Sequence, residues 1–365
     1  MTDNPLPPMA SEPPTPGTGP AEDFASGGSR IPAWGPWAVI AGTALVLAGF
    51  LSLIGFNIAL LAVGTVLVSI FIVYLWARKA EGRRQGFDRA ITLGIGSLFA
   101  LAMVPLVSLL YTVVSEGLSR MDPEFFSSSM RNVIGEGGGV LHAAVGTLII
   151  TGLATIAAVP IGIMAAVYLH EYGKGRLKRW LTFFVDVMTG IPSIVAGLFA
   201  FALFALIFGP GIRLGVMGSV ALTVLMIPIV VRSTEEMLRV VPDGLREASF
   251  ALGVSKWRTV AKVVLPTAMA GIVTGVMLAI ARVIGETAPL LITTGAFSSV
   301  NLNPFDGRMA NLPVFTYTQY KFPGVPPEPF IERAWGAALV LIIIVMVLFL
   351  AARLVSRRYG IELRK

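Results

Sequence analysis

The chain has 365 residues, of which 55% are apolar and only 13% are charged. Soluble domains carry about 25% charged residues and lack repeated uncharged runs of about 18 residues or more, so this composition excludes a soluble globular protein. The formal net charge of +7 is typical of inner-membrane proteins, whose cytoplasmic loops collect lysine and arginine. The absence of cysteine excludes disulfides, thiolate metal sites and a cysteine nucleophile.

The N-terminal segment, residues 1–36, holds nine of the 24 prolines together with Gly, Ser and Thr, and almost no bulky apolar side chain. Such a segment cannot bury enough apolar surface to offset the entropy lost on ordering. We therefore expect a disordered, Pro-rich tail on the cytoplasmic side.

Eight uncharged or nearly uncharged stretches follow the tail. Each reaches or approaches the roughly 20 helical residues that cross a ~30 Å hydrocarbon core. The stretches are 37–56, 58–77, 90–114, 140–169, 187–208, 214–231, 263–294 and 334–352. Because Asn57 alone separates the first two, they predict a transmembrane helical hairpin over 37–77. The pattern as a whole predicts an all-α polytopic membrane protein.

The basic residues predict the orientation of these spans. Of the 28 Lys and Arg residues, 21 fall near the two chain ends and in the loops 78–89, 170–180 and 232–262, whereas six fall in the alternate loops. Lysine and arginine collect on the cytoplasmic side of inner membranes. We therefore expect a multi-pass protein of the bacterial plasma membrane with both termini in the cytoplasm.

The long cytoplasmic loop 232–266 has the pattern of a short helix, a turn and a second helix. Pro242-Asp243-Gly244 marks the turn, and Asp243 is placed to cap the next helix. Gly253 is expected to end that helix with a positive φ. Between them, one charged and two small side chains would let another surface approach closely: Glu247, Ala248 and Ser249. The alternative interpretation is an ordinary amphipathic surface loop.

This loop resembles the coupling motif of permease subunits in binding-protein-dependent ABC importers, which reads Glu-Ala-Ala, three residues, Gly, nine residues, Ile-x-Leu-Pro. Ser249 replaces one alanine and Val263 the isoleucine, while five positions match: Glu247, Ala248, Gly253, Leu265 and Pro266. The resemblance implies that the motif helix lies in a cleft of an ATPase subunit. The sequence has no Gly-x-x-x-x-Gly-Lys-Ser/Thr phosphate loop, so ATP and Mg²⁺ are expected on that separate chain and no cofactor on this one.

Three further segments resemble the PstA type of phosphate importer permease: Gly190-Ile-Pro-Ser-Ile-Val195, Arg282-Val-Ile-Gly-Glu-Thr-Ala-Pro289 and Asn311-Leu-Pro-Val314. The resemblance covers residues 90–356 and implies a six-helix, MetI-like permease core, which the hairpin 37–77 precedes as an extra element. It also implies four kinds of partner: a second permease of the PstC type, an ATPase dimer of the PstB type, an extracytoplasmic phosphate-binding protein of the PstS type, and membrane lipid. Nucleic acid is not expected.

Two charges in the span 263–294 point to an anion pathway. Arg282 lies well inside this span, where a charge costs roughly 2.5–3.5 kcal/mol on insertion scales. Glu286 follows four residues later, so in a continuous helix the two side chains would pair. A guanidinium offers phosphate a planar fork of donors, so we expect Arg282, Glu286 and the adjacent Thr287 to line the pathway. The alternative is a structural ion pair that locks helices together.

Arg232 and Ser193 are further candidates for the pathway. Arg232 ends the span 214–231, where it either serves the pathway exit or anchors the helix at the membrane interface. The chain is expected to break at Pro192, which would let Ser193 donate to substrate oxygens; helix packing by small residues is the alternative. The glycine run 135–139 is expected to be a flexible connection. No metal site follows from His142 and His170, which lie on opposite sides of the predicted membrane.

Three other classes of protein were weighed. A permease for another oxyanion would keep the coupling motif. A secondary transporter, coupled to protons through Glu286, would not need that motif and should show repeat-like hydropathy in its halves, which this sequence lacks. A membrane enzyme is disfavoured because no Ser/His/Asp, paired-carboxylate or metal-ligand cluster is present. The sequence therefore favours a transport subunit that is not an enzyme.

Overall fold

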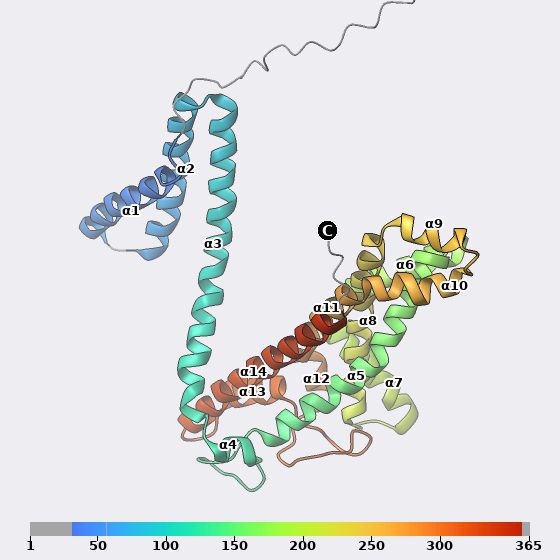
Figure 1. Cartoon of the computed structure of the whole chain (residues 1–365). Coiled ribbons are helices and arrows are strands. Elements are labelled where there is room, and N and C mark those ends of the chain that lie inside the picture. The colour runs from blue at the N-terminus through green and yellow to red at the C-terminus, as the bar shows by residue number, and fades with distance from the viewer. Residues whose placement is uncertain (1–30, 56, 360–365) are drawn as a thin grey trace, which may run out of the picture. The chain divides into compact units, whose positions relative to one another are not determined.

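The computed structural model describes residues 31–55 and 57–359, and every regular element among them is a helix (Figure 1). The predicted all-α fold class is confirmed. The disordered tail predicted for 1–36 lies almost entirely outside the described residues. The chain divides into two compact units, residues 1–108 and 109–365, and helix α3 (Arg83–Gly117) contributes to both.

The N-terminal unit contains two helices where the sequence predicts a hairpin, α1 (Gly35–Ile54) and α2 (Ile58–Ala80). A buried hydrogen bond of 2.6 Å between the hydroxyls of Thr43 and Ser69 joins them. At the end of α2, the Glu81 carboxylate pairs with Arg89 of α3, with 2.7 Å between Oε2 and Nε. Within lipid, hydrogen bonds of this kind add to the close packing of apolar helices, because hydrophobic burial drives no helix association there.

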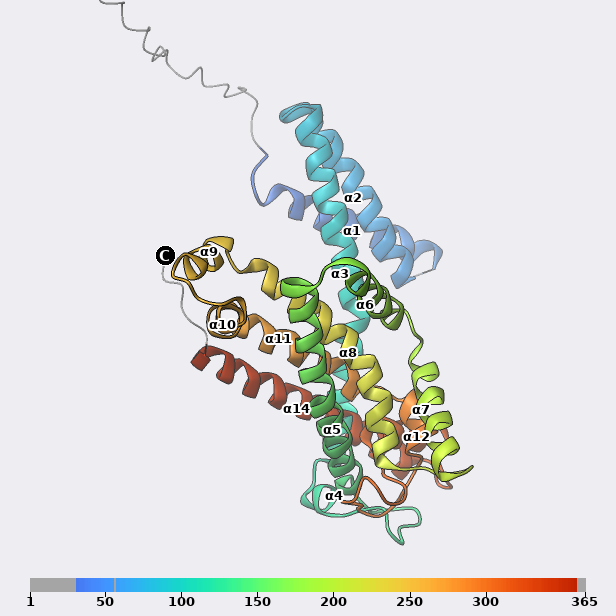
Figure 2. The same ribbon diagram turned by 90° about the vertical axis from the view of Figure 1, so that its right-hand side faces the viewer.

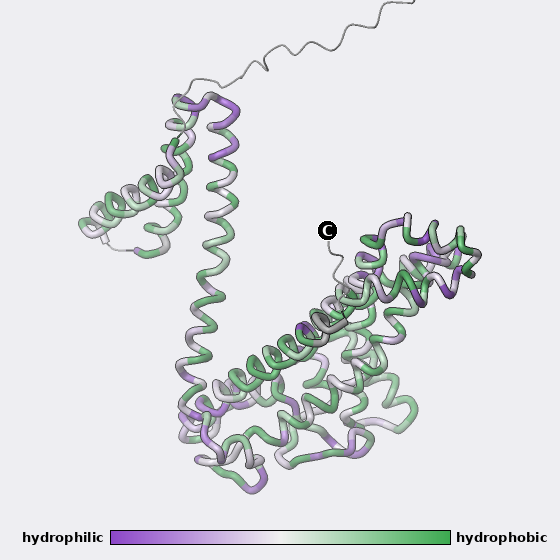
Figure 3. The backbone as a smooth tube through the Cα atoms, in the orientation of Figure 1, coloured by the Kyte–Doolittle hydropathy of each residue, from purple (hydrophilic) through white to green (hydrophobic). Residues whose placement is uncertain are grey.

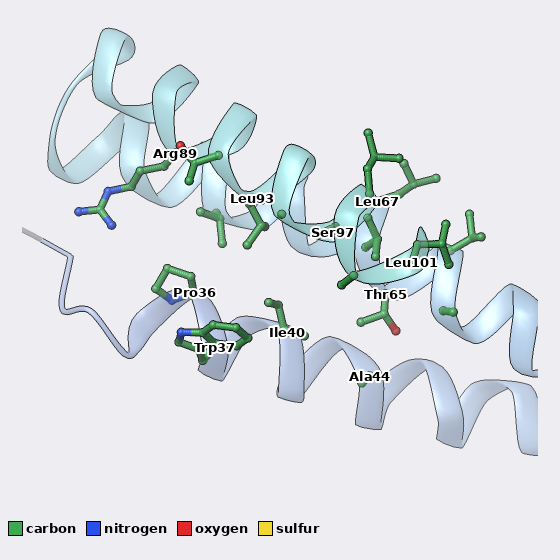
Figure 4. Close-up of a pocket in the computed structure, with 18 of the residues that line it drawn as sticks. Pro36, Trp37, Ile40, Ala44, Thr65, Leu67, Arg89, Leu93, Ser97 and Leu101 are labelled. Carbon is green, nitrogen blue, oxygen red and sulfur yellow. The ribbon is translucent and has the colours of Figure 1, made fainter. Parts of the chain in front are cut away.

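A cavity of about 1260 Å³ lies between α1, α2 and α3 (Figure 4). Its lining is mostly apolar and includes Trp37, Ile40, Leu93 and Leu101, with Arg89 towards one end. None of the residues predicted for the substrate pathway lines it.

The C-terminal unit begins within α3 and continues through short and long helices. In chain order these are η1 (Leu118–Arg120), α4 (Pro123–Ser127), α5 (Leu141–Val167), the π-helical turn η2 (Tyr168–Tyr172), α6 (Gly175–Thr189), α7 (Ser193–Phe208), α8 (Gly215–Val240), α9 (Asp243–Ala251), α10 (Lys256–Thr259), the π-helical turn η3 (Val260–Val264), α11 (Leu265–Ile284), α12 (Ala288–Thr293), α13 (Leu312–Lys321) and α14 (Glu328–Tyr359).

Helices α5 and α8 pack along each other at the centre of this unit, and their small residues allow a close approach. Ala154 and Ala158 of α5 are fully buried beside Leu222 and Met226 of α8. Gly146, also on α5, lies so near the loop before α13 that an added Cβ would sit 1.9 Å from the carbonyl oxygen of Ala310. Such small-residue contacts are the usual packing of membrane helices.

Seven described helices are long and apolar enough to cross a membrane, and an eighth span exists if α6 and α7 are counted as one. These two helices are bent by 108° at Gly190–Pro192, so the break predicted at Pro192 is confirmed and the stretch predicted at 187–208 lies across it. The span predicted at 263–294 is also interrupted, since α11 ends at Ile284 and α12 begins at Ala288.

The polar residues of this unit gather at its two ends. Helices α9 and α10 lie at one end, and α4 lies at the other with the long loop that precedes α13 (Figures 1 and 2). Apolar residues predominate along the helices between these ends (Figure 3). This distribution suits a helical unit that crosses a hydrocarbon layer.

Two arginines donate hydrogen bonds to the glycine run 135–139, which was expected to be a flexible connection. The buried guanidinium of Arg333 donates from Nη1 to the carbonyl oxygens of Gly135 and Gly137 at 2.6 and 2.9 Å. Arg120 donates from Nη2 to the carbonyl oxygen of Gly138 at 2.8 Å. Glycine supplies the positive φ angles of this loop, and the two arginines then hold its carbonyl groups.

Candidate functional site

The coupling loop 232–266 begins as the last turns of α8, not as a separate short helix. Pro242 ends that helix, and α9 follows at once. Asp243 does not cap α9 as predicted, because it is itself the first helical residue. Its carboxylate instead accepts a hydrogen bond of 2.9 Å from Nη1 of Arg246.

The surface of α9 that faces away from the protein carries the predicted contact residues. Glu247, Ala248 and Gly253 are exposed. Apolar side chains stand beside them in the open, including Phe250 at 45% and Leu252 at 83% exposure. A charged residue among small and apolar ones, at the tip of the unit, is a surface that a protein partner can cover.

Gly253 ends α9 in the conformation that the sequence predicts. Its φ is +73°, a region that residues with a Cβ rarely adopt. Its amide donates to the carbonyl oxygen of Phe250 at 2.9 Å, and the amide of Val254 donates to that of Ser249 at 3.2 Å. These bonds satisfy the last carbonyl groups of the helix, as in other glycine-terminated helices.

Ser249, at the third motif position, faces inward, unlike the exposed Glu247 and Ala248. Its side chain is buried, and its Oγ lies 2.8 Å from Oγ1 of Thr259. The hydroxyl therefore ties α9 to α10, a bond that alanine could not make. Leu265 and Pro266 lie half-buried at the start of α11, directly after η3. The helix continues without a break from Lys256 to Ile284, so Pro266 removes one backbone donor just after the π-helical turn.

Arg282 and Glu286 do not form the predicted ion pair. Arg282 lies exposed on the last turn of α11, which ends at Ile284, and Glu286 lies half-buried beyond Gly285. Within residues 57–359 no salt bridge or hydrogen bond joins the two side chains. Pairing at a spacing of four residues requires a continuous helix, and the break removes it.

Helix α12, which follows the break after α11, packs on α7, which follows the break after α6. Helix α12 packs on α7 so closely that a Cβ added to Gly197 would sit 2.6 Å from the Cα of Pro289. Ser193 starts α7 and Thr287 immediately precedes α12, and both side chains are half-buried. The structure thus brings together the elements that carry two of the predicted pathway segments. Non-helical backbone at membrane depth occurs where it is buried in protein or lines a water-filled cavity.

Arg232 joins α8 to α6. Its Nη1 donates to Oε2 of Glu235 at 2.8 Å, and its Nη2 donates to the Asp186 carboxylate. These acidic partners were not predicted for it, although Asp186 precedes the predicted break. No described contact links Arg232 to Arg282 or Glu286.

A buried pair that the sequence did not reveal lies beside the motif, between Arg246 and Glu171. The only signal in the sequence was an acidic residue within a strongly basic loop. As for metal ions, no group of three or more His, Cys, Asp or Glu side chains that could hold one occurs among the described residues. His142 instead packs edge-on against Phe315, with ring centroids 5.2 Å apart.

The exposed coupling loop and the two broken membrane helices are features of a transporter subunit. Comparison with known proteins supports the same class. Residues 158–361 match the family described as binding-protein-dependent transport system inner membrane component, and the chain therefore belongs to that family. It is a multi-pass ABC importer permease that is not an enzyme, and its family carries no cofactor. Membership implies an ATPase and a binding protein as partners.

Within this family the chain groups with the PstA permeases. Phosphate transport system permease protein PstA 1 of Mycobacterium tuberculosis (strain ATCC 25618 / H37Rv) is 49% identical over 276 residues, 75% of this chain and 88% of the relative. PstA of Yersinia pestis is 37% identical over 284 residues, 76% of this chain and 92% of the relative. The predicted PstA resemblance is confirmed.

A solved structure of the same fold is that of a bacterial alginate ABC transporter in complex with an alginate pentasaccharide-bound periplasmic protein. One of its chains is 12% identical, with a TM-score of 0.54. The match covers 74% of this chain and 95% of that one. At this identity the likeness concerns the fold alone.

Proposed function

We propose that the chain is the PstA-type permease subunit of an ATP-driven importer of inorganic phosphate and that it forms half of the translocation pathway. The observation that carries this proposal is the exposed coupling helix α9, ended by Gly253 at φ +73°, in a chain 49% identical to a phosphate transport system permease. A surface of this kind suits a protein driven by an external ATPase.

The proposed orientation follows from the distribution of positive charge. The coupling helix and both termini face the cytoplasm of a bacterium, because most of the Lys and Arg residues lie in loops on that side. Residues 90–356 act as the permease domain, and the hairpin 37–77 is an accessory element.

The proposed partners complete an importer. A PstC-type permease supplies the other half of the pathway, two PstB-type ATPase subunits bind ATP, and a PstS-type protein delivers phosphate from outside. ATP binding draws the ATPase subunits together, and Glu247 and Ala248 on α9, with Gly253 just after it, receive that motion. Leu265 and Pro266 start α11 and pass it into the membrane.

The proposed pathway runs along the two helix breaks. Arg282 offers its guanidinium to the passing anion. Glu286, Thr287 and Ser193 stand at the breaks, where carboxylate, hydroxyl and freed backbone groups are available. Arg232 lies towards the C-terminal end of α8, where Asp186 and Glu235 hold its guanidinium in place. This favours a fixed positive charge near the cytoplasmic exit of the pathway.

Uptake by bacteria that lack their own PstA tests this function. Cells that express the chain with its partners should accumulate labelled phosphate at low external concentration, and excess sulfate should not compete. Competition by sulfate at equal concentration would instead favour the second candidate, a permease for another oxyanion.

A further inference from the structure

The coupling helix α9 is bound to the end of α5 by a buried ion pair. Arg246, on α9, donates from Nη2 to Oε1 of Glu171 at 2.9 Å and from Nε to the same oxygen at 3.2 Å. Glu171 belongs to the π-helical turn η2, which continues α5. The two residues are 75 positions apart in the sequence, so the pair is a contact between distant elements.

The same guanidinium also holds the end of α8. Nη2 of Arg246 donates to the carbonyl oxygen of Leu238 at 2.9 Å, and Nη1 donates to that of Val241 at 2.8 Å. A cation suits the C-terminal end of a helix, where carbonyl groups lack intrahelical partners. Arg246 therefore fixes α9 to α8 and to α5 at a single point.

Burial makes this connection stiff. The exposed fractions of the Arg246 and Glu171 side chains are 12% and 8%. A charge withdrawn from water is strongly destabilised when its partner is removed, so the two side chains are expected to stay together as α9 moves. Lys256 of α10 adds a second link, since its ammonium group donates to the carbonyl oxygen of Glu171 and lies 5.0 Å from the Tyr172 ring centroid.

We propose that Arg246 and Glu171 are positioning residues that pass the motion of α9 directly to α5. This inference rests on the proposed function, because it assigns a role within ATP-driven transport. The ATPase displaces α9, and the Arg246–Glu171 pair transmits this displacement to η2. Helix α5, which η2 continues, then moves together with α8, on which it packs. The covalent route through α10 and α11 acts at the same time and reaches α8 from another side.

Asp243 provides a matched control on the same arginine. Its carboxylate also lies 2.9 Å from a nitrogen of Arg246, yet its side chain is 88% exposed. Exposed ion pairs contribute little, because water screens them. Asp243→Asn should therefore leave coupling intact, whereas Glu171→Gln, which preserves size and removes the buried charge, should not.

The first test follows the motion without any transported substrate. The natural chain has no cysteine, so spin labels can be placed at Gly244→Cys on α9, where nothing lies within 4 Å of an added Cβ, and at the exposed Ile156→Cys on α5. Pulsed electron resonance on the full complex then measures one distance with and without ATP. We expect this distance to stay within about 2 Å between the two states, less than half of the ~5.4 Å pitch of a helix. In Glu171→Gln it should change or broaden on ATP binding, and in Asp243→Asn it should not.

The second test measures uptake together with the amount of assembled complex. Glu171→Gln and Arg246→Gln should each lower uptake about tenfold per assembled complex, with ATP hydrolysis retained. The double variant should be no worse than either single variant, because both act on one interaction. Asp243→Asn should transport at the natural rate.

Two results would overturn the role of the pair. One is an unchanged distance in Glu171→Gln, and the other is a loss of uptake that only follows a loss of assembled complex. Failure of the proposed function is distinguishable, since the unaltered complex would then accumulate no phosphate while the spin-label distances still report on the pair.

Discussion

Replacement of Gly253 tests the coupling loop most sharply. The residue ends α9 at φ +73°, and no atom lies within 4 Å of the position where a Cβ would stand. A side chain therefore meets no steric obstacle in the chain, and the cost of a substitution comes from the backbone alone. For residues other than glycine this left-handed conformation costs about 1–2 kcal/mol, and asparagine tolerates it best.

The magnitude follows from that cost. A penalty of about 1–2 kcal/mol lowers the equilibrium constant for the observed conformation by about 5- to 30-fold. Gly253→Val should lie at the upper end because β-branched residues fit this region worst, Gly253→Ala should be intermediate, and Gly253→Asn should be close to the natural chain. Titration of the ATPase subunit onto the purified permease pair measures this as a graded rise in Kd, and uptake should decline in the same order.

The control is Gly244→Ala, also on α9, at an exposed position with no positive φ and open space around it. It should bind the ATPase normally. Equal binding by all three Gly253 variants would refute a role for this conformation. An asparagine variant as poor as the valine variant would show that the ATPase itself requires the absence of a side chain, which is a different mechanism.

Three further predictions concern the pathway, the packing and the accessory unit. Arg282→Gln should abolish phosphate uptake while ATP hydrolysis by the complex persists, and Glu286→Gln should only slow uptake. The structure does not pair the two side chains, so restored uptake in the double variant would contradict their separate roles. Gly146→Ala should lower the free energy of unfolding by about 1–3 kcal/mol, since its Cβ would overlap the carbonyl oxygen of Ala310. Gly152→Ala on the same helix, with nothing within 4 Å of its Cβ, should leave stability unchanged, and thermal melting of the solubilised protein compares the two variants. A chain that starts near residue 80 should insert and transport phosphate normally, and failure of its complex to assemble, seen by co-purification, would place the hairpin in the functional core.

The apolar spans and the motif could be predicted because both are local in sequence. A run of about 20 apolar residues predicts a helix wherever it lies. The φ of Gly253 was predictable because only glycine adopts that conformation readily. The break at Pro192 was also predicted from local sequence, since proline lacks an amide donor and clashes with the preceding turn. Proline alone does not decide this, because Pro160 and Pro228 lie inside continuous helices.

Other features could not be predicted because they depend on distant contacts or on where a helix stops. The expected Arg282–Glu286 pair assumed a continuous helix, and Gly285 interrupts it. The inward orientation of Ser249 could not be predicted, because it depends on a hydrogen bond to Thr259 on another helix. The Arg246–Glu171 pair joins positions 75 residues apart, and no periodicity in either segment reveals it.

ATP-driven uptake of phosphate into proteoliposomes tests the central claim most directly. The vesicles would contain this chain, its partner permease and the ATPase, with the binding protein outside, ATP inside and an ionophore that collapses any proton gradient. We predict that labelled phosphate accumulates with ATP inside and does not accumulate when this chain is omitted. Uptake that proceeds without ATP, and only when the ionophore is left out and a proton gradient is imposed, would contradict the claim and identify a secondary transporter.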